Sequence, residues 1–125
     1  MKLRILGNSI RIRVSQKELS QISEQGQAND QINFAAGSTL AYQLRVSDTA
    51  QQLRSEFSAQ QIIVSIPRAM ASDWTSTDLV SLRGEQDLPD GQLKILVEKD
   101  FQCLDPRLDE DETDLFPHPD AKGQS

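Results

Sequence analysis

Four cationic side chains near the start of the chain are the residues whose types and spacing most clearly suggest binding chemistry. They lie in two runs that alternate apolar and charged residues around Gly7-Asn8, and they are Lys2, Arg4, Arg11 and Arg13. Alternation around two turn residues predicts a β-hairpin with a two-residue loop, in which all four cations share one face. Because guanidinium groups match phosphate and carboxylate oxygens, this face is a candidate site for a phosphate, a nucleotide or an acidic partner.

The register of this hairpin also predicts its buried face. A two-residue loop sets Arg4 opposite Arg11 and Lys2 opposite Arg13. The apolar residues between the cations then face the opposite way. We expect these side chains to turn into the core: Leu3, Ile5, Ile10 and Ile12.

Anions from the same chain are the alternative partners of the four cations. Glu98 and Asp100 alternate on one face of the last predicted strand. If that strand lies beside the first one, its carboxylates meet Arg4 and Lys2 in a cross-strand charge ladder. Basic and acidic residues balance from position 1 to 99, so the formal charge of −6 belongs to the residues that follow. The acidic stretch 109–114 is therefore a second internal source of counter-charge.

Catalytic chemistry has fewer candidates, and we predict no catalytic residue. Glu98 and Asp100 lie about 7 Å apart along a strand, which suits a pair of carboxylates in acid–base catalysis. The charge ladder, however, uses the same two groups. Cys103 is a candidate nucleophile with His118 as its base.

Metal binding has little support in the residue types. Cys103 and His118 are the single cysteine and the single histidine, whereas a zinc site needs two further ligands. Three residues imitate the first positions of a calcium loop but lack the glycine that such a loop requires: Asp109, Asp111 and Thr113. We therefore predict no metal and no cofactor.

About eight short strands, joined mostly by tight turns, must position these residues. One further hairpin has Ile32, Phe34 and alternate residues of 40–46 on its buried face. In another, residues 62–66 face residues 53–57. This spacing predicts a mainly β fold, an antiparallel meander that forms a small barrel or a twisted sandwich.

Two helical segments interrupt the strands. Ser15 and Glu18 form a capping box, and Gly26 provides a C-terminal stop, so we expect a helix over residues 16–25. A proline at its first position marks a helical turn over residues 67–74.

The alternating pattern ends after Leu104, which predicts a β domain over residues 1–104 and an acidic, partly irregular tail over residues 105–125.

No segment resembles a signal peptide, no apolar run approaches the roughly 18 residues of a membrane span, and one cysteine excludes an intrachain disulfide. These features predict a cytoplasmic protein that does not bind membranes. The negative net charge argues against a general nucleic-acid binder.

Three segments resemble a known family. Residues 1–11, residues 96–104 and the Asp114-Leu115-Phe116-Pro117 segment are similar to a family of short bacterial proteins classed only as a domain of unknown function. The resemblance implies a single small domain, and it transfers no activity, cofactor or catalytic residue.

The function that fits these observations is a non-catalytic accessory or interaction domain. Its expected partner is an unidentified protein or a second copy of the chain, bound through open strand edges. One alternative is a barrel that binds a small anion or a phosphate ligand. The second alternative is an enzyme that uses Cys103 or the carboxylates of Glu98 and Asp100.

Overall fold

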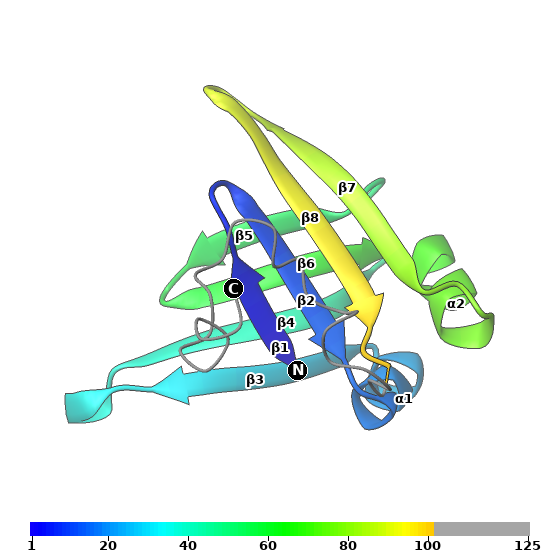
Figure 1. Ribbon diagram of the computed structural model, residues 1–125, viewed down its shortest axis with the longest axis horizontal. Helices are drawn as coiled ribbons and strands as arrows, with labels where there is room; N and C mark the ends of the chain where they lie inside the picture. Colours follow the sequence, from blue (N-terminus) through cyan, green and yellow to red (C-terminus); the bar gives the residue numbers. More distant parts are fainter. Residues whose placement is uncertain (102–125) are drawn as a thin grey trace, which may run out of the picture.

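Two four-stranded sheets face each other in the computed structural model, which describes residues 1–101 (Figure 1). In spatial order, sheet A contains β1 (Lys2–Ile5), β2 (Ser9–Val14), β8 (Gly91–Lys99) and β7 (Ser81–Leu88). Sheet B contains, also in spatial order, β3 (Gln27–Asn33), β4 (Thr39–Ser47), β6 (Gln61–Pro67) and β5 (Arg54–Ser58). The remaining elements are α1 (Gln16–Gln25), α2 (Arg68–Ser76) and the short 3-10 turn η1 (Ala35–Gly37). The prediction of a mainly β chain with two short helical segments is confirmed.

Each sheet consists of two antiparallel hairpins whose inner strands pair in parallel. In sheet A, β1 pairs with β2, β7 pairs with β8, and β2 lies parallel to β8. In sheet B, β3 pairs with β4, β5 pairs with β6, and β4 lies parallel to β6. A sandwich-like fold is therefore confirmed, but the pairing at the centre of each sheet is not antiparallel, and neither sheet closes into a barrel within residues 1–101. Tight turns determine pairing within a hairpin, whereas pairing between hairpins depends on long-range packing.

The chain contains an internal structural repeat, which consists of two ββαββ halves. The first half contains β1, β2, α1, β3 and β4, and the second contains β5, β6, α2, β7 and β8. Each half contributes one hairpin to each sheet, so the two halves interleave (Figure 1). Strands β2 and β6 are equivalent, because each is an inner strand that leads directly into a helix. The outer faces of the two sheets can therefore be compared position by position.

The first helix forms over the predicted residues. The Ser15 side chain accepts a hydrogen bond from the backbone N–H of Glu18, and the Glu18 carboxylate accepts one from the N–H of Ser15. Gly26 ends the helix in left-handed backbone with a φ of 81°. Ile22 on this helix is buried in the core.

The second helix begins one residue later than predicted and continues to Ser76, with Pro67 as its N-cap. Trp74 on this helix is completely buried. Its indole N–H donates a hydrogen bond to the carbonyl oxygen of Val80 at 2.9 Å, which ties the helix to the start of edge strand β7.

The core lies between the sheets, at the ends of the strands that connect to the helices. Its most deeply buried side chains are Ile12, Val14, Ile22, Leu44, Leu53, Val64, Ile66, Trp74 and Val97. At the hairpin tips the inward faces are exposed instead, since Ile5 is 60% exposed and Phe34 is 57% exposed. Ile32 is also largely exposed, so the expectation that these three residues are buried is wrong. The strands of the two sheets cross (Figure 1), and the tips extend past the opposite sheet.

The turn between β5 and β6 holds two non-glycine residues in left-handed backbone. Ala59 has a φ of 50° and Gln60 has a φ of 62°. This conformation costs an L-residue about 1 kcal/mol or more, and glycine avoids that cost. We therefore expect Gln60→Gly to raise the free energy of unfolding by about 0.5–1 kcal/mol, measured by urea denaturation. Gln60→Ala keeps the Cβ and is the matched control, so equal stability of the two variants would contradict this account.

Candidate anion-binding face

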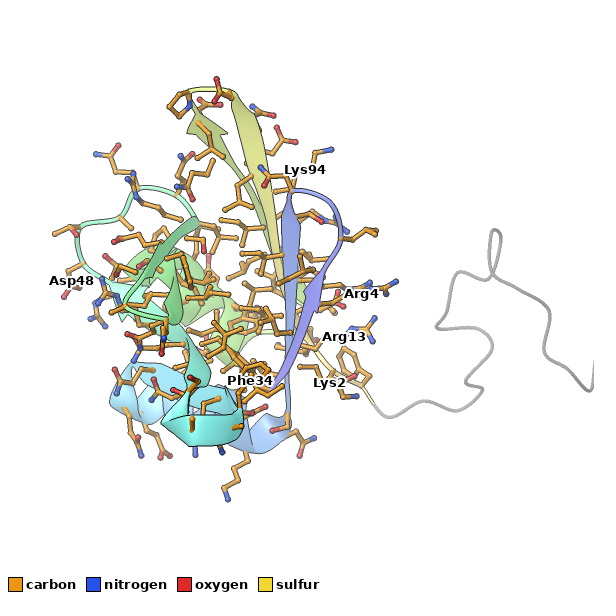
Figure 2. The ribbon with its side chains drawn as sticks, turned by 90° about the vertical axis from the view of Figure 1, so that its left-hand side faces the viewer. Lys2, Arg4, Arg13, Phe34, Asp48 and Lys94 are labelled. Carbon is orange, nitrogen blue, oxygen red and sulfur yellow. The ribbon has the colours of Figure 1, made fainter. Side chains whose placement is uncertain are left out.

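The first hairpin presents its four cations on the outer face of sheet A. Its predicted register is confirmed, since Arg4 lies opposite Arg11 and Lys2 lies opposite Arg13. A φ of 55° at Gly7 permits the two-residue loop. Figure 2 shows Lys2, Arg4 and Arg13 pointing away from the body of the molecule on one side.

A row of side chains crosses this face from one edge of the sheet to the other. In register order, the row contains Arg4 on β1, Arg11 on β2, Leu96 on β8 and Arg83 on β7. Neighbouring strands lie about 4.8 Å apart, so the Cα atoms of the two edge arginines are roughly 14 Å apart. We call this set of four residues the arginine row.

The sequence pattern does not identify Arg83 as part of this face, because nothing local shows that β7 lies two strands away from β2. The signal that could have found it is the turn at Pro89-Asp90, between Leu88 and Gly91. This turn fixes the register of the last hairpin, and that register sets Arg83 opposite Leu96.

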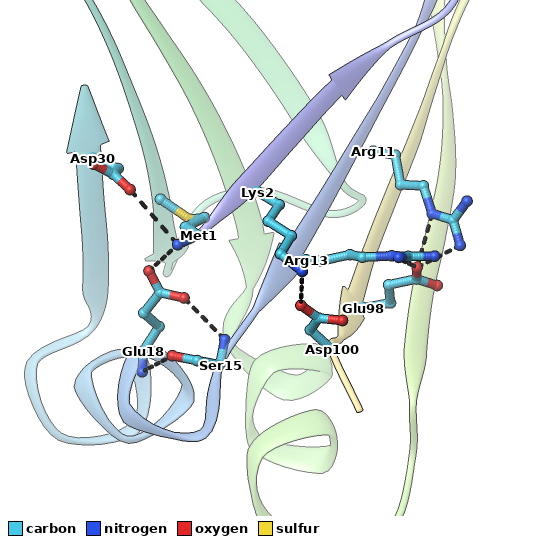
Figure 3. Close-up of polar contacts among 9 residues, drawn as sticks. All are labelled: Met1, Lys2, Arg11, Arg13, Ser15, Glu18, Asp30, Glu98 and Asp100. Atoms are coloured by element: carbon cyan, nitrogen blue, oxygen red, sulfur yellow. Dashed lines mark hydrogen bonds and ion pairs between the residues drawn. The ribbon is translucent and has the colours of Figure 1, made fainter. Parts of the chain in front are cut away.

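Glu98 lies beside the arginine row and binds two arginines at once (Figure 3). Its Oε1 accepts hydrogen bonds from Nε of Arg11 at 2.8 Å and from Nε of Arg13 at 2.7 Å. Nη2 of Arg11 lies 2.6 Å from the same oxygen. Burial raises the pKa of Glu98, but the hydrogen bonds from Arg13 and Arg11 outweigh burial and hold this pKa below its usual value. The carboxylate is therefore ionised at neutral pH.

Asp100 forms the other ion pair of the face, with Lys2 (Figure 3). Oδ2 of Asp100 lies 2.7 Å from Nζ of Lys2, and the hydrogen bond from Lys2 lowers the pKa of Asp100. The N–H of Asp100 donates to the carbonyl oxygen of Val14 at 2.9 Å, which holds the carboxylate beside the end of β2. Lys2 is largely exposed, so this pair contributes little to stability.

The arrangement differs from the expected ladder at Glu98. Strand β8 lies beside β2, and β1 is the edge strand on the far side of β2. Glu98 therefore reaches Arg11 and Arg13, whereas the expected contact with Arg4 is not formed.

A hollow of about 670 Å³ lies over the arginine row. Its cationic lining residues are Arg4, Arg11, Arg83 and Lys94, and Glu85 is the acidic one. Leu6 and Leu96 add apolar surface to the lining. Within residues 1–101, Arg4, Arg83 and Lys94 form no ion pair. The hollow therefore offers uncompensated positive charge next to apolar contact surface.

The edge strand β1 is held in place by contacts of the N-terminal ammonium group (Figure 3). This ammonium forms an ion pair with Glu18 and lies 3.6 Å from Oδ2 of Asp30. The hydroxyl of Tyr42 donates to the carbonyl oxygen of Met1 at 3.3 Å. Burial raises the pKa of Glu18, but the hydrogen bond from the ammonium group helps to hold it below its usual value. These contacts fix the start of the strand that carries two of the four cations.

The carboxylates on this face are not suited to act as general acids. Glu98 and Asp100 both bind cationic side chains, and the pKa of each lies below its usual value. A general acid must retain a proton near the working pH, so neither group suits that role at neutral pH.

The other candidates for chemistry lie largely outside the described residues. Cys103, His118 and the acidic stretch 109–114 belong to this part, so their expected roles stay predictions. In residues 1–101, no group of three or more His, Cys, Asp or Glu side chains converges to form a metal site. In the same part of the chain, no helix has the length and apolar character needed to span a membrane.

Comparison with known proteins gives one match. A family model described as a family of unknown function matches residues 1–120. No curated protein and no solved structure matches the chain.

Proposed function

The chain belongs to DUF7009, a family of unknown function, and we propose that it acts as a non-catalytic interaction domain. Its partner in this proposal is an extended, acidic protein segment that lies across sheet A along the arginine row. The observation that carries the proposal is the row itself, in which arginines from three strands line one hollow around Leu96.

The spacing of the arginines favours an extended ligand over a single small anion. The Cα atoms of Arg4 and Arg83 lie on opposite edges of the sheet, roughly 14 Å apart, so one phosphate group would contact both only if both side chains bent toward the centre of the row. A peptide in extended conformation advances about 3.3 Å per residue, so a short acidic segment can reach every arginine of the row. Arg11 is held in place by Glu98, so part of the site is rigid before the ligand binds.

The apolar part of the hollow favours a protein segment over a nucleic acid. Leu6 is 71% exposed and lines the hollow together with Leu96. Acidic and apolar residues in one peptide can contact both kinds of surface. Among the described residues, 1–101, those that line the hollow include no aromatic side chain on which a base can stack. The net charge of −6 also repels long polyanions.

The acidic stretch 109–114 of the chain has the same chemistry as the proposed partner and is followed by Leu115 and Phe116. In this proposal it competes for the same face, either within one molecule or between two copies. Neutralising it in the full chain, with D109N, E110Q, D111N, E112Q and D114N, should therefore tighten the binding of an external acidic peptide.

The test is a titration of the full-length chain with a fluorescent peptide of alternating glutamate and leucine, followed by anisotropy. We expect added salt to weaken binding, because ion pairs contribute to it. The double variant R4Q/R83Q should bind about tenfold more weakly or worse, as expected when two charge-assisted contacts are lost. Arg68→Gln is the matched control, since Arg68 pairs with Asp48 on another part of the surface. Equal affinities of the double variant and the control would overturn the proposal.

A further inference from the structure

A second hollow, of about 760 Å³, lies on the outer face of sheet B. Two arginines, Arg45 on β4 and Arg54 on β5, line it together with Ser65 on β6. The neighbours of Arg45 along its strand, Leu44 and Val46, face the core, so Arg45 points to the outside. This hollow is therefore separate from the arginine row, which lies on the outer face of the other sheet.

The two arginines flank a nearly buried serine in a single row. Arg45 lies beside Ser65 in the parallel pair of β4 and β6, and Ser65 lies opposite Arg54 in the β5–β6 hairpin. The Cα atoms of the arginines are thus two strand spacings apart, roughly 10 Å. Ser65 is 5% exposed, and its Oγ accepts a hydrogen bond from Nε of Arg45 at 3.4 Å. The side chains can converge on a single small group above Ser65.

The segment after β4 adds hydroxyl groups to one wall of the hollow. The Ser47 Oγ accepts hydrogen bonds from the N–H of Thr49 at 3.2 Å and from the N–H of Ala50 at 3.0 Å. Ser47 and Thr49 also place their hydroxyl oxygens 3.3 Å apart. An ion pair between Asp48 and Arg68 ties the same segment to α2. The wall is therefore ordered by its own contacts and carries groups that can donate to an oxyanion.

The internal repeat shows why, within residues 1–101, the row that contains the two arginines has no acidic residue. On sheet A, the equivalent row contains Lys2, Arg13 and Glu98, and Glu98 binds Arg13. On sheet B, the place of Glu98 is taken by Arg45. The acid that lines this hollow is Glu56, which lies two residues beyond Arg54 along β5 and forms no ion pair within residues 1–101.

We propose that this hollow binds the phosphate group of a small phosphomonoester, with Arg45 and Arg54 on either side of it. The hydroxyls of Ser65 and Thr49 are the neutral donors. Two guanidinium groups and hydroxyl donors match a tetrahedral dianion, which carries more charge and more acceptor oxygens than a carboxylate. The hollow exceeds the size of a bare phosphate, and its surplus volume is available for the organic part of an ester.

The experiment is an NMR titration of the uniformly labelled full-length chain with inorganic phosphate and, separately, with glycerol phosphate. Saturable shifts are expected at the amides of Ser65, Thr49 and Ala50 with both probes, with tighter binding of the ester. Binding of glycerol phosphate should weaken below its second pKa, near 6, where the dianion is lost. Inorganic phosphate has a higher second pKa, so its binding should weaken at a higher pH. Sodium sulfate, which stays a dianion throughout, should bind without that pH dependence.

Single substitutions test whether the two arginines of this hollow bind the phosphate group. Arg45→Gln and Arg54→Gln should each weaken phosphate binding by about tenfold. Lys17→Gln on α1 is the control, because this exposed cation lines neither hollow, and it should leave phosphate binding unchanged. Both hollow arginines are exposed, so these variants should fold, as the dispersion of their spectra will show. Unchanged phosphate affinity in Arg45→Gln, or equal shifts with sodium chloride at the same ionic strength, would overturn the proposal. Neither result would affect the acidic-segment proposal, which concerns the opposite sheet.

Discussion

Replacing Glu98 with glutamine is expected to destabilise the protein while strengthening its binding of acidic ligands. Glu98 is 9% exposed, and its carboxylate accepts hydrogen bonds from both Arg11 and Arg13. A neutral amide oxygen leaves the two guanidinium groups without their counter-charge. Their side chains are 34% and 28% exposed, so water offsets part of the loss, and we expect a decrease of about 1–2 kcal/mol in the free energy of unfolding.

The same substitution removes one negative charge beside the arginine row and releases Arg11 from its internal partner. The acidic peptide should therefore bind several-fold more tightly to Glu98→Gln than to the natural chain. Asp100→Asn is the matched control, because Lys2 is 72% exposed and its loss of a partner should cost less than about 1 kcal/mol. A Glu98→Gln variant that is as stable as the natural chain, or that binds the peptide more weakly, would contradict this account.

The pH dependence of stability follows from the same contacts. Because the pKa of Glu98 is lower in the folded than in the unfolded chain, the unfolded chain takes up the proton first as the pH falls. The contribution of Glu98 is complete above its unfolded pKa of about 4.5 and is lost as the pH falls through the folded pKa. Urea denaturation between neutral and acidic pH should show a smaller loss of stability in Glu98→Gln than in the natural chain. The pKa values of Asp100, Glu18 and Asp48 are lowered in the same way, so these groups also contribute to the pH dependence.

Gly84→Ala is expected to have an effect of similar or larger size, about 1–3 kcal/mol of destabilisation. A Cβ at Gly84 would lie 2.8 Å from the Cβ of Leu53, which is closer than two carbon atoms can approach. Leu53 is 1% exposed, so its side chain has no free space to move into. Edge strands β5 and β7 of the two sheets meet at this point, and the backbone N–H of Ser55 donates to Oε1 of Gln86 at 2.7 Å beside it.

Thermal or urea denaturation of Gly84→Ala tests this expectation. Glu85→Ala, on the adjacent outward-facing position of β7, is the control and should change stability by less than about 0.5 kcal/mol. If the sheets were free to separate at this corner, the added methyl group would be accommodated and the two variants would be equally stable.

The sequence predicts the local parts of this fold well because they depend on neighbouring residues. Gly7 determines the loop of the first hairpin and hence the pairing of Arg4 with Arg11. Ser15 and Glu18 mark the start of α1. In both cases, a turn or a cap acts within a few residues, and no distant contact is needed to recognise it.

The parts that could not be predicted depend on how the hairpins meet. The parallel pairing of β2 with β8 brings Glu98 to Arg13, and the position of β7 adds Arg83 to the candidate site. The turn between β7 and β8 sets Arg83 opposite Leu96, but no local pattern places β8 beside β2. The crossing of the sheets likewise leaves Ile5 and Phe57 exposed, although each occupies an inward-facing position of its strand.

The central claim is that acidic segments bind across the outer face of sheet A, and amide chemical-shift mapping tests it most directly. Titration of the labelled full-length chain with the glutamate–leucine peptide should shift amides along the arginine row, at Arg4, Arg11, Leu96 and Arg83, and leave those of β4 and β6 unchanged. Shifts confined to sheet B, or to the exposed apolar tips around Ile5 and Phe57, would contradict the claim.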